Sequence, residues 1–316
     1  MAKKTIAVIG ATGAQGGGLA RAIPSDKSGE FAVRAITRNP GSDKAKALAA
    51  QGAEVVKADL DDAASLKQAF KGAYGAFCVT NFWEHFSPQK ETAQGKTLAE
   101  AAKAAGIQHA IWSTFEDTRD YVPLDDDRMP TLQGNYKVPH FDAKAEANEY
   151  FADLGVPTTF LYTSGYMENL IFFGWGPQKD EDGTLFVVYP MDDVKLPLIA
   201  AEDIGKCAYG IFKRGKEYIG KTVGVAGEHL TGTEIAQTLS KALGKPVAYR
   251  AVPADVYRSF DFPGADDIGN MFQFKRDFTK VYAKNRSLEE SRRLNPGLKT
   301  FKQWLDENAA RIPIPD

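Results

Sequence analysis

The first 160 residues alternate between short apolar runs and segments with helical composition. The apolar, β-branched runs predict strands at residues 5–9, 32–37, 54–57, 75–80, 110–113 and 158–162. The segments between them predict helices at 19–23, 43–51, 63–70, 89–105 and 140–154. Because the strands are apolar throughout, helices should cover both faces of the sheet. This alternation predicts an α/β fold with a Rossmann-type, doubly wound parallel sheet.

The chain after residue 160 has a less regular pattern. It predicts a strand at 195–199 and helices at 201–212, 231–243 and 301–310, with Thr231 or Thr233 capping the 231–243 helix. The aromatic run at 172–175 is typical of a core segment. We therefore expect a nucleotide-binding domain at 1–160 and a smaller, partly interleaved α/β domain at 161–316 that covers the nicotinamide and substrate cleft. The acidic segment 117–133 follows the fifth strand, and we predict that it closes on bound cofactor.

Composition narrows the class of protein. The 316 residues carry a net charge of −2, with 43% hydrophobic and 25% charged residues, which is typical of a soluble globular protein and argues against direct nucleic-acid binding. No window reaches the roughly 18 apolar residues of a membrane helix, and no signal peptide is expected. Cys78 and Cys207 are expected to be reduced core residues. We expect no metal site and a cytoplasmic location, with the nucleus as an alternative.

The loop after the first strand carries the strongest chemical signal. Its GxxGxxG spacing follows a strand and opens a helix, which is the context of a dinucleotide-binding loop. A Cβ in this turn would keep a pyrophosphate from the backbone N–H groups at the helix N-terminus. The residues expected to bind the pyrophosphate are Gly10, Thr12, Gly13, Ala14, Gln15 and Gly16. Gly17 and Gly18 are expected to let the helix pack closely on the sheet. A glycine-rich turn without a ligand is the alternative.

The end of the second strand indicates which dinucleotide is bound. NAD sites place an acidic residue there, whereas Arg38 occupies the position in this chain. Arginine can hold a 2′-phosphate with two parallel hydrogen bonds, and Thr37 and Asn39 can add further bonds. The cofactor is therefore predicted to be NADP(H), unless Arg38 is only a surface residue. Asp59, after the third strand, either contacts the adenine or caps the next helix.

The expected nicotinamide end departs from the usual dehydrogenase pattern. Classical short-chain dehydrogenases pair a tyrosine and a lysine four residues apart on one helix, whereas this helix begins with His140 and Lys144 at that spacing. Lys144 is expected to bind the nicotinamide ribose. His140 can donate a proton, because imidazole titrates near neutrality, and a structural role for either residue is the alternative. The other residues expected to line the cofactor follow the strands: Thr80, Asn81, Phe82, Ser113, Tyr166 and Asn169.

Six segments together resemble the NmrA-like family of atypical short-chain dehydrogenases. These segments are residues 10–16, 37–40, 52–56, 80–84, 140–144 and 166–170, and residues 262–265, 270–272 and 294–296 extend the likeness to nearly the whole chain. Within the family, the chain is most similar to the HSCARG-type NADPH sensor proteins. The resemblance implies a Rossmann domain, a small α/β domain and NADP(H) binding. It also implies that many members have no demonstrated catalysis, that some act as redox-sensing regulators that bind a protein partner, and that others are reductases.

Two functions follow as hypotheses. The first is a redox-sensing regulator with weak or no catalysis, whose partners are a regulatory protein or a second copy of the chain. The missing tyrosine favours this function. The second is an NADPH-dependent reductase of a quinone, an enone or a small carbonyl compound, which Lys144, His140 and a candidate aromatic pocket favour.

Overall fold

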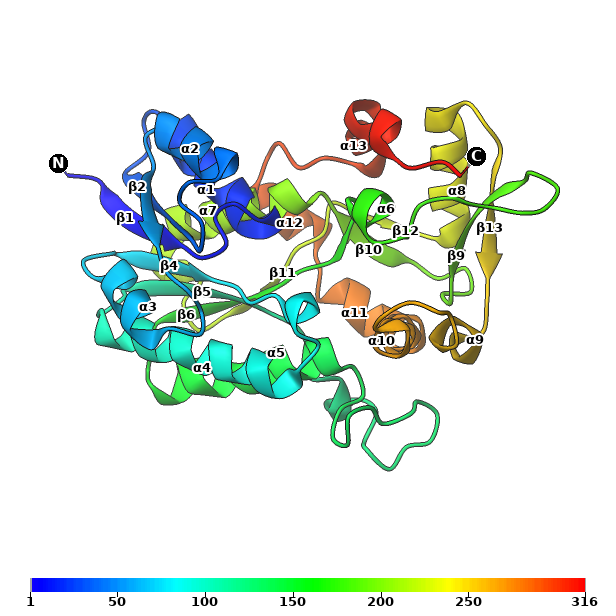
Figure 1. The fold of residues 1–316 in the computed structure, drawn as a ribbon, viewed down its shortest axis with the longest axis horizontal. Coiled ribbons are helices and arrows are strands. Elements are labelled where there is room, and N and C mark those ends of the chain that lie inside the picture. The colour runs from blue at the N-terminus through cyan, green and yellow to red at the C-terminus, as the bar shows by residue number, and fades with distance from the viewer. Residues whose placement is uncertain (1, 316) are drawn as a thin grey trace.

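The computed structural model describes residues 2–315, which form one large and two small sheets (Figure 1). The large sheet is parallel throughout, with the strand order β11-β6-β5-β4-β1-β2-β3. Its strands are β1 (Lys4–Val8), β2 (Phe31–Thr37), β3 (Glu54–Lys57), β4 (Gly75–Cys78), β5 (His109–Thr114), β6 (Thr158–Tyr162) and β11 (Thr222–Gly224). The order reverses at β1, so the predicted Rossmann-type, doubly wound sheet is confirmed.

Helices cover both faces of this sheet (Figure 1). On one face lie α3 (Ala63–Phe70), α4 (Pro88–Ala104) and α5 (Pro139–Asp153), and on the other α1 (Ala14–Ser25), α2 (Asp43–Ala50), α7 (Ala201–Arg214) and α12 (Leu288–Leu294). Alternate residues of β1 point into the two layers: Ile6 and Val8 belong to the core on the α1 side, and Ala7 to the core on the α4 side. The apolar strands are thus buried from both sides, as the sequence predicts.

Two glycines allow α1 and α7 to pack closely. A Cβ on Gly18 would lie 2.3 Å from the carbonyl oxygen of Glu202, and a Cβ on Gly205 would lie 2.1 Å from the Leu19 nitrogen. The two backbones therefore touch where any side chain would force them apart. The expectation that Gly18 lets α1 pack closely on the sheet is wrong, because the atoms nearest to a Cβ on Gly18 belong to Glu202 of α7.

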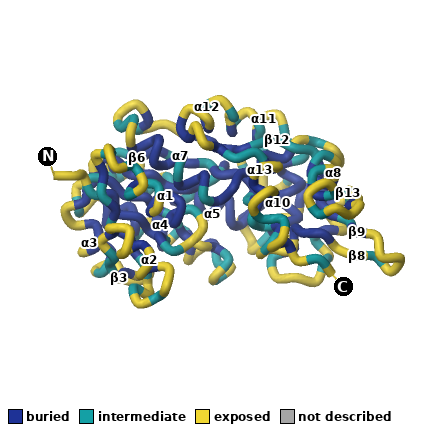
Figure 2. The backbone as a smooth tube through the Cα atoms, turned by 90° about the horizontal axis from the view of Figure 1, so that it is seen from above, coloured by how far each residue is buried: buried dark blue, intermediate teal, exposed yellow. Residues whose placement is uncertain are grey.

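The C-terminal part has its own core beside the sheet (Figure 2). Trp175, Tyr189 and Phe272 pack at its centre. Its strands form the orders β12-β10-β7 and β13-β9-β8. The bounds are β7 (Gly165–Tyr166), β8 (Gln178–Lys179), β9 (Leu185–Tyr189), β10 (Leu196–Ile199), β12 (Glu228–Leu230), β13 (Val247–Ala251), α6 (Asn169–Phe172), α8 (Gly232–Leu243), α9 (Ala254–Arg258), α10 (Ala265–Asp277), α11 (Thr279–Lys284) and α13 (Phe301–Asn308). Thr231 caps α8 in a capping box with Glu234, which decides between the two expected caps.

The two parts share chain segments. β11, α7 and α12 come from residues after 160 and complete the large sheet and its cover, which agrees with the expected interleaving. Helix α5 runs between the two cores: Phe141 packs in the C-terminal core, and Phe151 packs under the sheet. The division at 1–160 and 161–316 stays a prediction.

Segment 117–133 does not lie at the cleft described below. None of its residues lines that cavity. Gln273 and Asn270 of α10 donate hydrogen bonds to the carbonyls of Arg128 and Pro130, and Met129 is 1% exposed in the C-terminal core. Two hydrogen bonds join its backbone to α10, and its closure on bound cofactor stays a prediction.

The two cysteines are free and buried, as expected. Burial raises the pKa of both the Cys78 and the Cys207 thiols, so neither thiol is an activated nucleophile. Among residues 2–315 we find no helix with the length and apolar character needed to span a bilayer.

Candidate functional site

A cavity of 1470 Å³ opens at the carboxyl ends of the parallel strands, where the C-terminal part faces the sheet. This is the crevice in which doubly wound sheets bind ligands. The sequence-predicted residues that line it are Gly10, Thr12, Gly13, Ala14, Gln15, Gly16, Thr37, Arg38, Asn39, Asp59, Thr80, Asn81, Phe82, His140, Lys144, Tyr166 and Asn169. Ser113 is not in the wall. It is 1% exposed, and its hydroxyl donates to Oε1 of Gln15 at 2.8 Å.

The glycine loop has the geometry of an anion site. Gly10 has a φ of +62°, which favours glycine, and a Cβ on Gly16 would lie 2.4 Å from the Ile9 carbonyl oxygen. Helix α1 begins directly after Gly13, whose position has no side-chain cap. The first-turn N–H groups of the helix therefore have no intrahelical partner and face the cavity mouth.

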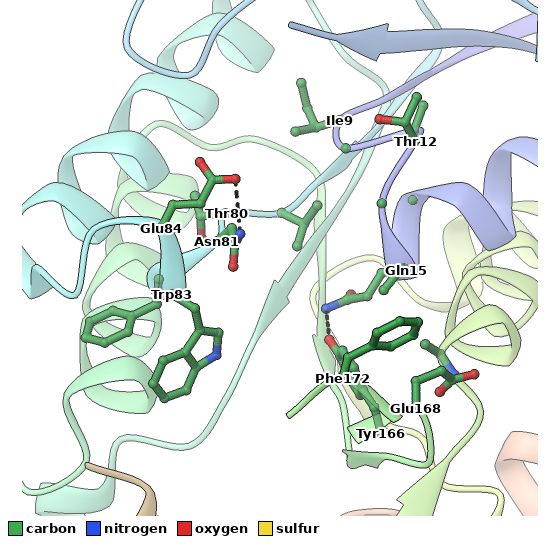
Figure 3. A pocket seen from close by; sticks show the side chains of 18 of the residues that line it. Ile9, Thr12, Gln15, Thr80, Asn81, Trp83, Glu84, Tyr166, Glu168 and Phe172 are labelled. Atoms are coloured by element: carbon green, nitrogen blue, oxygen red, sulfur yellow. Dashed lines mark hydrogen bonds between the residues drawn. The ribbon is translucent and has the colours of Figure 1, made fainter. Parts of the chain in front are cut away.

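Gln15 joins the two walls of the cavity behind this loop. Its Nε2 donates to the Tyr166 hydroxyl at 2.5 Å, while its Oε1 accepts from Ser113 (Figure 3). Burial raises the pKa of Tyr166 to about 12, so this hydroxyl stays protonated at neutral pH. Next to it, Glu168 accepts hydrogen bonds from the backbone N–H of Ala201 and the indole of Trp304, so this carboxylate caps α7.

Arg38 lies at the end of β2 and is paired with an acidic residue. Its Nη1 and Nη2 donate to the two carboxylate oxygens of Glu84, each at 2.8 Å. Glu84 ends the short 3₁₀ helix η1 (Phe82–Glu84) and also accepts from Nδ2 of Asn81 at 3.1 Å (Figure 3). Burial by itself would raise the pKa of Glu84, but the hydrogen bonds from Arg38 and Asn81 hold it below its usual range.

The loop after β3 shows which of its acidic residues caps the next helix, and this residue is not Asp59. Asp62 caps α3, because its Oδ1 accepts from the backbone N–H groups of Ala64 and Ser65. Asp59 instead accepts from the Asp61 backbone N–H and lines the cavity near Arg38. Its contact with an adenine stays a prediction.

Lys144 belongs to a buried polar network. Its Nζ lies 2.5 Å from Oε1 of Glu91 and donates to Oγ1 of Thr80, also at 2.5 Å. Nε2 of His85 lies 3.3 Å from the other Glu91 oxygen. Burial by itself would raise the pKa of Glu91, but the Lys144 charge and the hydrogen bonds of His85 and Thr80 lower it to about 2. Glu91 is therefore ionised and fixes Lys144 against the end of β4.

His140 is held by a second carboxylate that comes from α10. Its Nδ1 lies 2.6 Å from Oδ1 of Asp267, and its backbone N–H donates to Oδ2 of the same residue at 3.2 Å. This contact places the Nδ1 proton on the Asp267 side. Nε2 has no hydrogen-bond partner in the described part of the chain, and the ring lines the cavity. The Trp83 and Phe141 rings pack on it with centroids at 4.8 and 4.7 Å.

The wall beyond His140 is aromatic and carries one buried amine. Phe172 and Phe173 line the cavity with 66% and 51% of their surface exposed, so the expectation that this run is core is wrong for these two residues. Lys275 is 3% exposed, and its Nζ lies 3.1 Å from Sδ of Met271. No ion pair holds this amine within residues 2–315. Burial lowers the pKa of Lys275 to about 7.

Several of these residues were not identified from the sequence. Asp267 lies 127 positions from His140, and neither periodicity nor a motif points to the pair. Glu91 lies inside an alanine-rich helix, where a glutamate is ordinarily solvent-exposed. The resemblance included Glu84 in the segment 80–84, but only the structure brings it to Arg38.

The glycine loop, the carboxyl-edge crevice and the cation after β2 define a Rossmann-type dinucleotide-binding fold. The chain belongs to the NmrA-like family, whose family model matches residues 2–305. The NmrA-like oxidoreductase FrzB of a Cladobotryum species is 31% identical over 293 residues, covering 85% of this chain and 83% of that protein. The greater similarity to HSCARG-type proteins stays a prediction.

Solved structures agree with this membership. NmrA, described as a negative transcriptional regulator, has been solved with NADP; it is 27% identical, has a TM-score of 0.78 and covers 97% of this chain and 95% of its own. A second NmrA structure, at 28% identity, 0.78 TM-score and the same coverage, contains NAD. The triphenylmethane reductase of a Citrobacter species, complexed with NADP(H), shares the fold at 19% identity and a TM-score of 0.73, covering 96% of this chain and 99% of its own.

Proposed function

We propose that this protein binds NADP(H) in the carboxyl-edge cavity and reduces an apolar, conjugated carbonyl compound such as a quinone or an enone. The observation that carries the proposal is the contact between His140 and Asp267, because it aims a proton-transfer group at the cavity. The sequence favours a regulator because the usual tyrosine is missing. A histidine oriented by a carboxylate supplies the proton-transfer group that this tyrosine would have provided.

The cavity fits a dinucleotide. Gly16 allows a phosphate to approach the backbone, and the N-terminus of α1 offers donors to it. Arg38 lies where a 2′-phosphate is expected, with Thr37 and Asn39 beside it. The volume of 1470 Å³ exceeds the roughly 1,000 Å³ of large small-molecule sites, which leaves room for a second ligand. The NmrA structures with NADP and NAD support the same site.

In this reduction, the side chains of the protein would supply the proton that the substrate oxygen takes up. NADPH, when bound, supplies the hydride. The protonated imidazole of His140 gives the proton on Nε2 to the carbonyl oxygen of the substrate, and solvent returns it. Asp267 orients the ring through Nδ1 and stabilises the charged imidazolium. Trp83, Phe172 and Phe173 form apolar walls against which a planar substrate can stack.

The direct test is a panel of quinones, enones and aldehydes, with NADPH consumption followed at 340 nm. We expect turnover by the wild type and a loss of about 100-fold in His140→Phe, because a positioned acid contributes about 10²–10⁴ to the rate. NADPH affinity should change less than twofold in that variant. No turnover of any substrate by the wild type, with NADPH bound, would contradict the reductase function.

A second candidate function is regulation by cofactor occupancy, with a protein partner or a second copy of the chain. The observation that favours it is the engagement of Lys144 by Glu91 and Thr80, which occupies ammonium protons that a ribose or a substrate would otherwise accept. The likeness to NmrA supports it as well. In this role, the protein would act in the cytoplasm or in the nucleus. Light scattering and pull-down with and without NADPH test it, and identical results in both conditions would exclude it.

A further inference from the structure

The carboxylate of Glu84 occupies both terminal nitrogens of Arg38, the group on which the expected 2′-phosphate site depends. We propose that Glu84 sets the preference between NADP(H) and NAD(H) by competing with the 2′-phosphate for Arg38. The inference rests on the proposed cofactor site and adds a specificity-determining residue to it. It concerns the adenosine end of the cleft and is independent of whether the protein is a reductase or a regulator.

The geometry of the pair is that of a phosphate complex. Two parallel N–H···O bonds of 2.8 Å each are the contacts by which a guanidinium holds a phosphate. Asn81 donates a third hydrogen bond to Glu84 and fixes the orientation of the carboxylate. A 2′-phosphate can gain the same contacts only after Glu84 has released Arg38.

The pair is exposed enough to exchange partners. The Arg38 and Glu84 side chains retain 63% and 45% of their surface. An exposed ion pair contributes about 1 kcal/mol or less, so an incoming phosphate can displace it at modest cost. Glu84 therefore weakens 2′-phosphate binding without abolishing it.

The surrounding charges act in the same direction. Asp59 and Asp61 lie near Arg38 and add negative charge to this end of the cavity. Lys90 is paired with Asp61 at 2.8 Å, and Lys44, near the start of α2, also lines the cavity. A displaced Glu84 would thus lie beside the phosphate dianion among other acidic groups, which raises the cost of NADP(H) binding.

Glu84 does not oppose the binding of NAD(H). Its ribose has a 2′-hydroxyl instead of the phosphate, and an acidic residue at this place accepts a hydrogen bond from that hydroxyl in NAD sites. Glu84 can serve as that acceptor while it remains bound to Arg38. The pair of Arg38 and Glu84 therefore accepts both cofactors. It reduces the difference between the affinities of the protein for NADP(H) and for NAD(H).

The test is calorimetric titration of the full-length protein with NADPH and with NADH. In Glu84→Gln we expect NADPH to bind about fivefold more tightly, since the competing charge is removed, while NADH affinity stays equal or falls. In Arg38→Gln we expect NADPH affinity to fall. In the Arg38→Gln background, Glu84→Gln should raise NADPH affinity by less than it does when Arg38 is present, because the competition for Arg38 is gone and only direct repulsion of the phosphate by Glu84 remains. Glu30→Gln, which breaks an exposed pair with Lys4 away from the cavity, is the matched control and should change neither affinity.

The outcomes separate the inference from the proposed function. If Glu84→Gln leaves the ratio of NADH to NADPH dissociation constants within twofold of the wild type, or lowers it, Glu84 does not compete for Arg38 and the inference is overturned. The cofactor site would still stand in that case. If the wild type binds neither dinucleotide, the cofactor site itself fails, and the inference fails with it.

Discussion

Oδ1 of Asp267 lies 2.6 Å from Nδ1 of His140, across the junction between α10 and α5. The two residues come from different helices: α5 runs from the C-terminal core to the layer under the sheet, and α10 packs in the C-terminal part. The contact therefore forms only when the C-terminal part is packed against the sheet. It links the proposed chemistry to the packing of the two cores.

Replacing Asp267 tests this link. Asp267→Asn should lower turnover about 100-fold with little effect on NADPH affinity, because an amide neither stabilises the imidazolium nor fixes its tautomer. Steady-state kinetics at 340 nm measure the first effect, and calorimetry measures the second. Asp266→Asn, at the exposed neighbouring position, is the control and should behave like the wild type. Full turnover in Asp267→Asn would exclude a role of this carboxylate in proton transfer.

The aromatic wall predicts a change in substrate affinity alone. Phe172→Ser removes an exposed ring from the cavity and should raise KM for an apolar quinone about fivefold, since part of a phenyl contact is worth about 1 kcal/mol. The kcat value and the NADPH affinity should stay unchanged. Phe262→Ser removes an exposed ring outside the cavity wall and serves as the control. An equal effect of both variants would mean that Phe172 does not contact substrate.

Glu91 predicts an acid-dependent stability. Its folded-state pKa of about 2 lies below the ordinary value of 4.5, so its contribution is complete above about pH 5 and is lost as the pH falls toward 2. The shift corresponds to about 3 kcal/mol of unfolding free energy. Glu91→Gln should be less stable by about this amount at pH 7, and the difference from the wild type should shrink toward pH 2. Urea unfolding at several pH values measures it. Glu100→Gln, exposed on the same helix, should show no such convergence.

Lys275 predicts a second increase of stability with pH, at higher pH, in which the residue destabilises the fold. Its folded-state pKa of about 7 lies below the ordinary 10.5, so the fold carries the cost of a buried charge below pH 7 and loses that cost as the pH rises toward 10.5. Lys275→Met should therefore be more stable than the wild type at pH 6, by about 3 kcal/mol or more, and the gain should diminish in alkali. Lys280→Met, at an exposed position of α11, is the control. A destabilised Lys275→Met protein would show that the amine has a compensating partner.

The nucleotide end of the site could be predicted from the sequence because its signals are local. The strand, the glycine loop and the helix follow one another within the first 25 residues, and Arg38 directly follows the second strand. Each signal depends on backbone conformation or strand polarity, which neighbouring residues determine. The structure accordingly places the predicted loop residues in the cavity wall.

The nicotinamide and substrate end of the cavity could not be predicted from the sequence, because its contacts join segments that are far apart in the chain. The pairs of His140 with Asp267 and of Lys144 with Glu91 depend on helix packing, which no local pattern encodes. Short strands such as β7 and β8, with two residues each, are too brief for a periodicity to emerge. The exposure of Phe172 also ran against the rule that aromatic runs are buried, and such exceptions occur at binding sites.

The contact between Gly18 and Gly205 has a consequence for the synthesis of the chain. Helix α1 needs α7 as its neighbour, and the sheet lacks its edge strand β11 until residue 224 has emerged from the ribosome. At about 5–20 residues per second, the N-terminal 160 residues spend on the order of ten seconds without the elements that cover them. During that interval the apolar face of α1 is exposed. The nascent chain therefore keeps the face of α1 that α7 covers exposed until residues 201–214 have emerged.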